Sequence, residues 1–171
     1  MKNQKTLTIL TFIPVLAIAV MIFLFSSQNA ADSNRSSGYI VEVVLNIVSP
    51  EHDALSETHQ KEQLEKINHF VRKTAHFLEY AMLGFFLLLH ISVKLLGSNH
   101  KLPFILALSA GVGSLYAVTD ELHQLLISGR SGQITDVAID SLGVAAGIIL
   151  LLLIIRLSGK YSVLYNPDQN T

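Results

Sequence analysis

The chain has 171 residues, of which 50% are hydrophobic and 15% are charged, and its mean hydropathy is +0.47. Soluble domains usually carry about 25% charged residues, so this composition predicts a membrane protein rather than a water-soluble domain. A formal net charge of −1 offers no basic surface for nucleic acid, and the absence of cysteine excludes disulfides and thiolate metal sites.

The first apolar run extends from Leu7 to Phe25 and follows two lysines, Lys2 and Lys5. About 20 such residues span a bilayer as a helix. A cleaved signal peptide is the alternative, but its apolar core usually has about 7–15 residues and ends at a small-residue cleavage site. Residues 7–25 therefore favour an uncleaved membrane helix over a signal peptide.

Residues 26–70 are predicted to form a long extracytoplasmic connection. Its first part, Ser26 to Gly38, is polar and rich in serine, as is typical of a linker. A helical pattern from Leu64 to Val71 is expected to lead into the next span, and His52, His59 and His69 are interpreted as solvated loop histidines. Apolar residues before Ser49-Pro50 recur at helical spacing, which predicts a short amphipathic helix that lies on the membrane surface or caps the bundle: Ile40, Val43, Val44, Ile47 and Val48.

Three further apolar segments predict membrane helices at residues 77–96, 102–127 and 134–157, followed by a polar tail at 158–171. The expected fold is all-α: one polytopic membrane domain over residues 1–171, with four transmembrane helices. The amphipathic segment lies between the first and second of these helices.

The distribution of Lys and Arg predicts the orientation of the spans. The short loop on one side of the membrane contains only Arg130. The flanks on the other side contain six basic residues: Lys2, Lys5, Lys94, Lys101, Arg156 and Lys160. We therefore expect both termini in the cytoplasm. Arg72 and Lys73 fall on the outer side and oppose the charge rule, so another constraint must require them.

Polar residues at the outer ends of the last three spans are expected to converge. The apolar stretch from Leu142 to Ile155 is too short to cross about 30 Å at about 1.5 Å per residue. Asp136 and Asp140 must therefore lie in the outer leaflet or its interface, on one helix face that Gly143 and Gly147 extend as a close helix contact. Arg72 shares the face of His76 and Glu79 on the second span, and Glu121 is placed to the side of the third. Together these faces give a predicted polar cluster: Lys73, His76, Glu79, Tyr80, Asp120, Glu121, His123, Gln124, Arg130, Asp136 and Asp140.

Five short segments in fixed order resemble the VanZ-like family of membrane proteins: Phe25-Ser26-Ser27-Gln28, Val71 to Tyr80, Asp120-Glu121-Leu122-His123-Gln124, Ser128-Gly129-Arg130-Ser131-Gly132 and Asp136 to Gly143. The resemblance covers nearly the whole chain. It departs at Ser128, where the family often has proline. It implies a multi-pass protein of the bacterial cytoplasmic membrane. It also implies an association with resistance to teicoplanin, a lipid-bearing glycopeptide that acts at the outer face of the membrane.

The cluster has a purely structural interpretation, in which its residues form ion pairs that hold the bundle together. However, ionisable residues inside a membrane are costly, and this cost favours a functional interpretation. The expected function is non-enzymatic. The protein would bind or shield an anionic envelope lipid or a lipoglycopeptide and so lower susceptibility to drugs such as teicoplanin. The expected ligand-binding residues are Arg72, Lys73, Tyr80, Glu121, Gln124, Arg130, Asp136 and Asp140.

A membrane enzyme that modifies an envelope lipid or a lipid-linked precursor is the alternative. Its candidate catalytic residues are His76, Glu79, Asp120 and His123. No metal or other cofactor is expected, although this alternative allows a divalent ion among Glu79, Asp120, His123 and Asp136. Proton or ion transport ranks lower, because apart from His90 no ionisable residue continues down the spans.

Overall fold

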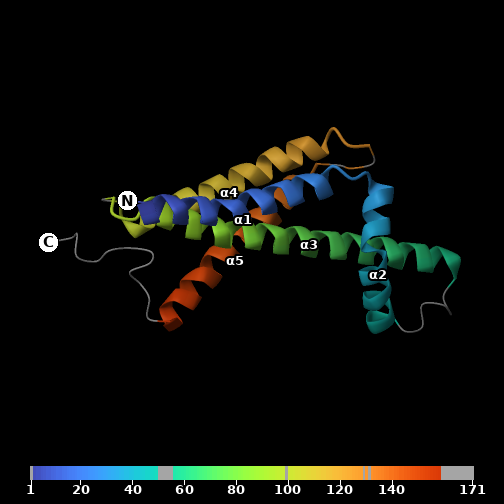
Figure 1. The fold of residues 1–171 in the computed structure, drawn as a ribbon. Helices are drawn as coiled ribbons and strands as arrows, with labels where there is room; N and C mark the ends of the chain where they lie inside the picture. Colours follow the sequence, from blue (N-terminus) through green and yellow to red (C-terminus); the bar gives the residue numbers. More distant parts are fainter. Residues whose placement is uncertain (1, 50–55, 99, 129, 131, 159–171) are drawn as a thin grey trace.

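A computed structural model describes residues 2–49, 56–98, 100–128, 130 and 132–158. Within these residues the chain forms five helices and no strand: α1 (Lys2–Ser26), α2 (Ala30–Val48), α3 (Glu57–Lys94), α4 (Leu102–Gln124) and α5 (Ile134–Ser158). Helices α1, α3, α4 and α5 form a bundle, and α2 lies across α3 near one end of it (Figure 1). The predicted all-α fold is confirmed, while the predicted tail lies outside the described residues except for Ser158.

Four helices are long and apolar enough to cross a membrane, and they correspond to the four predicted spans: Gln4–Ser26, Glu57–Lys94, Leu102–Gln124 and Ile134–Ser158. Large apolar side chains on their outer faces are exposed, for example Leu10 at 57% and Leu150 at 52%. Continuous apolar surface of this extent suits lipid tails rather than water.

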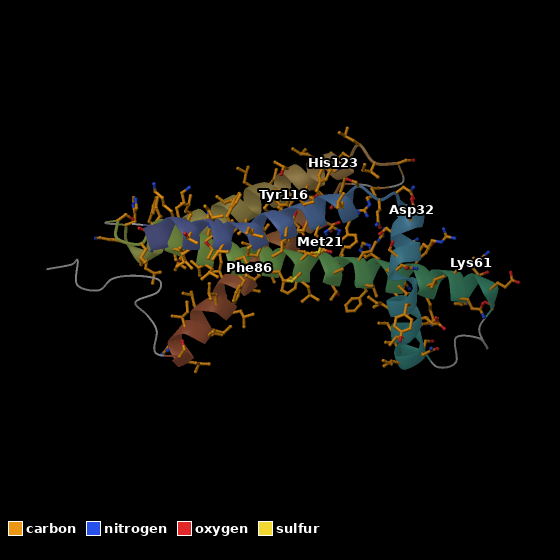
Figure 2. All side chains as sticks on the ribbon, viewed as in Figure 1. Met21, Asp32, Lys61, Phe86, Tyr116 and His123 are labelled. Carbon is orange, nitrogen blue, oxygen red and sulfur yellow. The ribbon has the colours of Figure 1, made fainter. Side chains whose placement is uncertain are left out.

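The second span belongs to a much longer helix than the sequence predicted. Helix α3 has 38 residues and begins at Glu57, well before the predicted start of the span at Phe77. At about 1.5 Å per residue it measures about 57 Å, well beyond the roughly 30 Å of a bilayer core. The pattern from Leu64 to Val71 does lead into the span, as expected. The first half of α3 therefore carries polar residues beyond the apolar part of the bundle, towards Lys61 (Figure 2).

The prediction of a linker from Ser26 to Gly38 is wrong, because α2 begins at Ala30. Asn29 caps this helix, since its side-chain oxygen accepts a hydrogen bond from the backbone N–H of Asp32 at 2.9 Å. The serines that suggested a linker donate to helical carbonyls: Ser36 Oγ to Asp32 O and Ser37 Oγ to Ser33 O, each at 3.0 Å. These local bonds allow a polar sequence to stay helical.

Helix α2 is two-sided, as the predicted amphipathic segment requires. Val41 faces the protein and is 3% exposed. Ile40 and Ile47 lie on the opposite face and are 55% and 75% exposed. A helix with one face on the bundle and an apolar face turned outwards fits the membrane interface.

The core of the bundle depends on close contact between α3 and α5. Fully buried side chains meet there from three helices: Ile22, Tyr80, Leu88 and Val144. A methyl group at Gly143 would lie 2.5 Å from the Phe77 carbonyl oxygen, and one at Gly147 would overlap the Ala81 carbonyl oxygen. The predicted small-residue contact is confirmed, and it brings the two backbones into direct contact.

Substitution of Gly147 by alanine should lower stability, because the added methyl group meets backbone that cannot move aside. Overpacking of this kind typically costs about 1–3 kcal/mol. Thermal unfolding of the detergent-purified protein measures the loss.

Gly111 is the matched control, because a methyl group there meets nothing within 4 Å. Alanine is favoured over glycine inside a helix by about 1 kcal/mol, so Gly111→Ala should be neutral or stabilising. If Gly147→Ala were as stable as the unchanged protein, the close α3–α5 contact would be contradicted.

The orientation predicted from Lys and Arg is testable because the chain has no cysteine of its own. Ser128, in the α4–α5 turn, is exposed. With Ser128→Cys, an impermeant thiol reagent should label intact cells. Ser98→Cys, also exposed but in the α3–α4 turn, should be labelled only after permeabilisation. The reverse pattern would contradict the predicted orientation.

Candidate functional site

A cavity of about 100 Å³ lies where α3, α4, the α4–α5 turn and α5 meet. We name it the polar pocket after the residues that line it: His69, Arg72, Lys73, His76, Glu121, Gln124, Arg130, Gln133, Asp136, Ile139 and Asp140. Seven of these belong to the predicted cluster, and Arg72 is a predicted ligand-binding residue, so the three spans and the turn converge as expected. The other four predicted residues do not line the cavity: Glu79, Tyr80, Asp120 and His123.

His69 lines the pocket, and its interpretation as a loop histidine is wrong. It lies on α3 at helical spacing from Lys73 and His76, so all three share one face. The same spacing is present in the sequence. It places His69 beside Lys73 and His76 only if residues 69–76 belong to one continuous helix.

Asp120 lies beneath the pocket floor and is 4% exposed. Its Oδ2 accepts hydrogen bonds from Ser26 Oγ at 2.8 Å and from Gln124 Nε2 at 3.2 Å, whereas its Oδ1 is buried without a hydrogen-bond partner. Ser26, the last residue of α1, is fully buried and was not predicted as part of the site. The Tyr80 hydroxyl, beside the Asp120 carboxylate, is also buried without a hydrogen bond of ordinary geometry.

His76 and Asp140 approach Asp120 from α3 and α5. One donor atom from each of the three side chains lies within 4.8 Å of the other two. Asp140 is 2% exposed and makes no hydrogen bond or ion pair within the described chain. The Nδ1 atom of His76 is buried without a hydrogen-bond partner, and Glu79 Oε2 lies 4.0 Å away from it. Among the described residues, these three have the geometry to hold a metal ion, unlike the set named from the sequence.

The basic residues of the pocket are paired unequally. Lys73 Nζ lies 2.7 Å from Asp136 Oδ1, in an ion pair whose two side chains are 26% and 27% exposed. Arg72 lines the cavity without an ion pair or hydrogen bond to any described residue. Its guanidinium therefore remains available to a ligand.

Arg130 is held by neutral acceptors rather than by a carboxylate. Its Nη1 donates to Gln124 Oε1 and its Nη2 to the Phe25 carbonyl oxygen, both at 3.1 Å, and its Nε is buried without a partner. Burial lowers the pKa of the Arg130 guanidinium from its ordinary value, and the positive charge of Arg72 lowers it further. Two like charges thus face the same cavity.

The prediction that His123 faces the cluster and Glu121 lies to the side is wrong. His123 turns towards α1, where its ring stacks on Phe23 at 4.7 Å and its Nε2 lies 3.1 Å from Ser27 Oγ. Glu121 is 6% exposed and lines the pocket, and its Oε1 accepts a hydrogen bond from the Gln133 backbone N–H at 2.6 Å. The chain folds back after α4, and this bond turns Glu121 inwards. Figure 2 shows His123 near the end of α4 and Tyr116 further back.

The Lys73–Asp136 pair predicts a charge-exchange result. Lys73→Asp and Asp136→Lys should each reduce thermal stability, because each replaces an ion pair of 2.7 Å by two like charges on neighbouring helices. The double variant should recover most of the loss, with a coupling energy of about 1 kcal/mol for a partly buried pair. The exposed Lys66–Glu62 pair is the control, and its exchange should show a smaller coupling. No recovery in the double variant would contradict the pairing.

The comparisons with known proteins agree with this architecture. The family model described as VanZ/LLP1 matches residues 11–156, a range that includes α2, α3, α4 and most of α1 and α5. No curated protein and no solved structure gives a match. Because the family model covers most of the chain and every segment of the polar pocket, this protein belongs to the VanZ/LLP1 family.

Proposed function

We propose that the polar pocket binds the anionic headgroup of an amphiphile of the bacterial cell envelope. The observation that carries this proposal is the pair of arginines, Arg72 and Arg130, which face the cavity without a carboxylate partner. Two guanidinium groups at a partly buried site repel each other, and an anion placed between them would remove that cost. Arginine also matches phosphate and carboxylate in bidentate geometry.

The size of the cavity suits a small headgroup. One water molecule needs roughly 10–15 Å³ of such space, so about 100 Å³ accommodates several water molecules or one phosphate or carboxylate group. The other proposed ligand contacts are Lys73, Glu121, Gln124, Asp136 and Asp140. Among them Asp136 holds Lys73 and Glu121 holds the backbone of the α4–α5 turn. Tyr80, also expected as a contact, is fully buried outside the lining of the cavity.

Apolar side chains beside the pocket support an amphiphile rather than a free anion. Phe70 follows His69 on α3 and is 64% exposed, and Leu126 and Ile134, on either side of the α4–α5 turn, are 82% and 91% exposed. Such residues suit an acyl chain that leaves the headgroup at the pocket. A lipid of the outer leaflet and the lipid anchor of a lipoglycopeptide both have this chemistry.

The envelope role follows from the family and from the charge distribution. Membership of the VanZ/LLP1 family is consistent with a link to teicoplanin resistance. In the proposed orientation both termini are cytoplasmic and the pocket opens on the outer side of the bacterial cytoplasmic membrane, where teicoplanin acts. Binding or shielding an anionic amphiphile there would lower susceptibility to such lipoglycopeptides.

A membrane enzyme remains the second candidate, favoured by one observation. His76 lies at the back of the pocket with an unpartnered Nδ1 and with Glu79 at 4.0 Å, as a general base beside a carboxylate would. Mass spectrometry of envelope lipids incubated with the purified protein would separate the two candidates. A product that forms with the unchanged protein and not with His76→Ala would replace the binding function by an enzymatic one.

The variant Arg72→Gln tests the binding proposal, because Arg72 holds no other residue in place. Dodecyl phosphate is the probe, titrated into the protein in a neutral detergent. We expect at least about a tenfold loss of affinity, since a charge-assisted hydrogen bond contributes about 1.5–3 kcal/mol. Arg35→Gln, an exposed position on α2, should bind as the unchanged protein does.

The same variants test the role in the cell. At equal membrane abundance, the unchanged protein and Arg35→Gln should raise the teicoplanin concentration that inhibits growth, and Arg72→Gln should not. Equal binding of dodecyl phosphate by Arg72→Gln would overturn the proposed site. Intact binding with no effect on growth would overturn the resistance role alone.

A further inference from the structure

Three donor atoms at the back of the polar pocket converge without a shared partner. They come from His76 of α3, Asp120 of α4 and Asp140 of α5, and all lie within 4.8 Å of one another. Ligands bound at about 2.1 Å to a tetrahedral ion lie about 3.4 Å apart, so small side-chain rotations would bring these atoms to coordination distance. The glycine contact of α5 on α3 fixes two of the three supporting helices, and the close approach of Gly113 on α4 to the Val144 side chain fixes the third.

The unsatisfied atoms are the second observation. Asp120 and Asp140 are 4% and 2% exposed, Asp120 Oδ1 has no hydrogen-bond partner, and Asp140 makes no hydrogen bond or ion pair within the described chain. His76 Nδ1 is also buried without a partner. Buried polar groups are nearly always satisfied, and a buried charge without compensation costs several kcal/mol. The Tyr80 hydroxyl lies beside Asp120 and can donate to its free oxygen, but Asp140 and His76 Nδ1 need a partner other than the described side chains.

Asp120 is oriented in the way a metal ligand requires. Ser26 Oγ and Gln124 Nε2 both donate to its Oδ2, and this arrangement fixes the carboxylate and leaves Oδ1 free. Hydrogen bonds that orient a ligand in this manner are typical of metal sites.

The charges of the site also favour a divalent cation. The strongest electrostatic neighbours of Asp140 are four other carboxylates: Asp120, Glu121, Asp136 and Glu79. These five acids face three basic side chains, Arg72, Lys73 and Arg130, so with every carboxyl group ionised the site would carry an excess of two negative charges. An anionic headgroup would increase that excess, whereas one divalent ion would cancel it.

We propose that His76, Asp120 and Asp140 bind one divalent first-row metal ion, and that this ion and the two arginines together hold the anionic headgroup. One imidazole with two carboxylates suits Zn²⁺ or Mn²⁺, and the cavity leaves the remaining coordination positions to water or to a phosphate oxygen. The proposed metal site is inferred from the geometry of the three side chains and does not depend on the proposed function. The proposed contact between the metal ion and the headgroup rests on the proposed function.

The first experiment uses the unchanged full-length chain in neutral detergent. After chelator treatment, titration with Zn²⁺ and with Mn²⁺ should give one ion per chain by elemental analysis, together with a rise in the unfolding temperature. X-ray absorption of the Zn²⁺-loaded protein should show a single histidine among oxygen ligands. Absence of a bound ion, or an ion without histidine, would overturn the proposal and favour a proton shared by the two carboxyl groups.

The second experiment compares matched carboxylate variants. Asp140→Asn should weaken metal binding by more than about 100-fold, because it removes a ligand. Glu65→Gln removes a carboxylate at an exposed position on the same helix as His76 but no ligand, so it should change the affinity by less than about threefold. Asp140→Asn should also unfold at a higher temperature than the unchanged protein when no metal is present, because it removes repulsion between carboxylates. Equal losses in the two variants would overturn the assigned ligands, as would unchanged binding by Asp140→Asn. If Asp140→Asn does not fold, His76→Gln provides the same comparison.

Dodecyl phosphate binding with and without Zn²⁺ separates this inference from the proposed function. Binding that strengthens at least about tenfold with Zn²⁺ supports the shared site. Metal binding without dodecyl phosphate binding would leave the metal site and overturn the proposed function. Dodecyl phosphate binding of equal strength in chelator, with no ion bound, would leave the proposed function and overturn the metal site.

Discussion

The backbones of α3 and α5 touch where Gly143 and Gly147 place no side chain between them. Asp140 lies one helical turn before Gly143, so this contact carries its carboxylate against α3 beside His76. A wider separation of the two helices would leave Asp140 facing lipid or water, and the Lys73–Asp136 pair, at 2.7 Å, would not form. The positions of the acids on α5 therefore follow from a packing constraint further along the same helix.

Helix α1 closes the site from the other side, although its sequence is almost entirely apolar. Its last turn provides Ser26 Oγ for Asp120 and the Phe25 carbonyl oxygen for Arg130. Both groups lie at the end of α1 that faces the α4–α5 turn (Figure 1). Without α1, Asp120 would lose one of its two hydrogen-bond donors and Arg130 one of its two acceptors. The first helix is thus a structural part of the polar pocket as well as a candidate span.

The lengths of the apolar runs predicted the four spans. The inward face of α5 was also predictable, because it follows from helical spacing alone: Asp136, Asp140, Gly143 and Gly147. The inward faces of α4 and α2 were harder to predict. Glu121 turns inwards because a backbone N–H twelve residues later bonds to it, and His123 finds an aromatic partner on α1. The polar start of α2 is helical because serine hydroxyls bond to its own carbonyls. Such choices depend on tertiary contacts and on local side-chain geometry that a hydropathy pattern does not contain.

The charges of the pocket are separated by depth, and this separation constrains any ligand. Arg72 and Lys73 lie on α3 before its apolar part, whereas Asp120 and Asp140 are nearly fully buried. An anion is attracted by the guanidinium groups but repelled by the carboxylates beneath them, so it can bind well only if the carboxylates are neutralised. Protonation and a bound cation are the two ways to achieve this. One hydrogen bond can join the free oxygen of Asp120 to the free nitrogen of His76, but it serves only two atoms. A cation can bind both atoms and Asp140 together, because it accepts lone pairs from three ligands at once. The convergence of three donors therefore favours a cation over a proton as the group that completes the site.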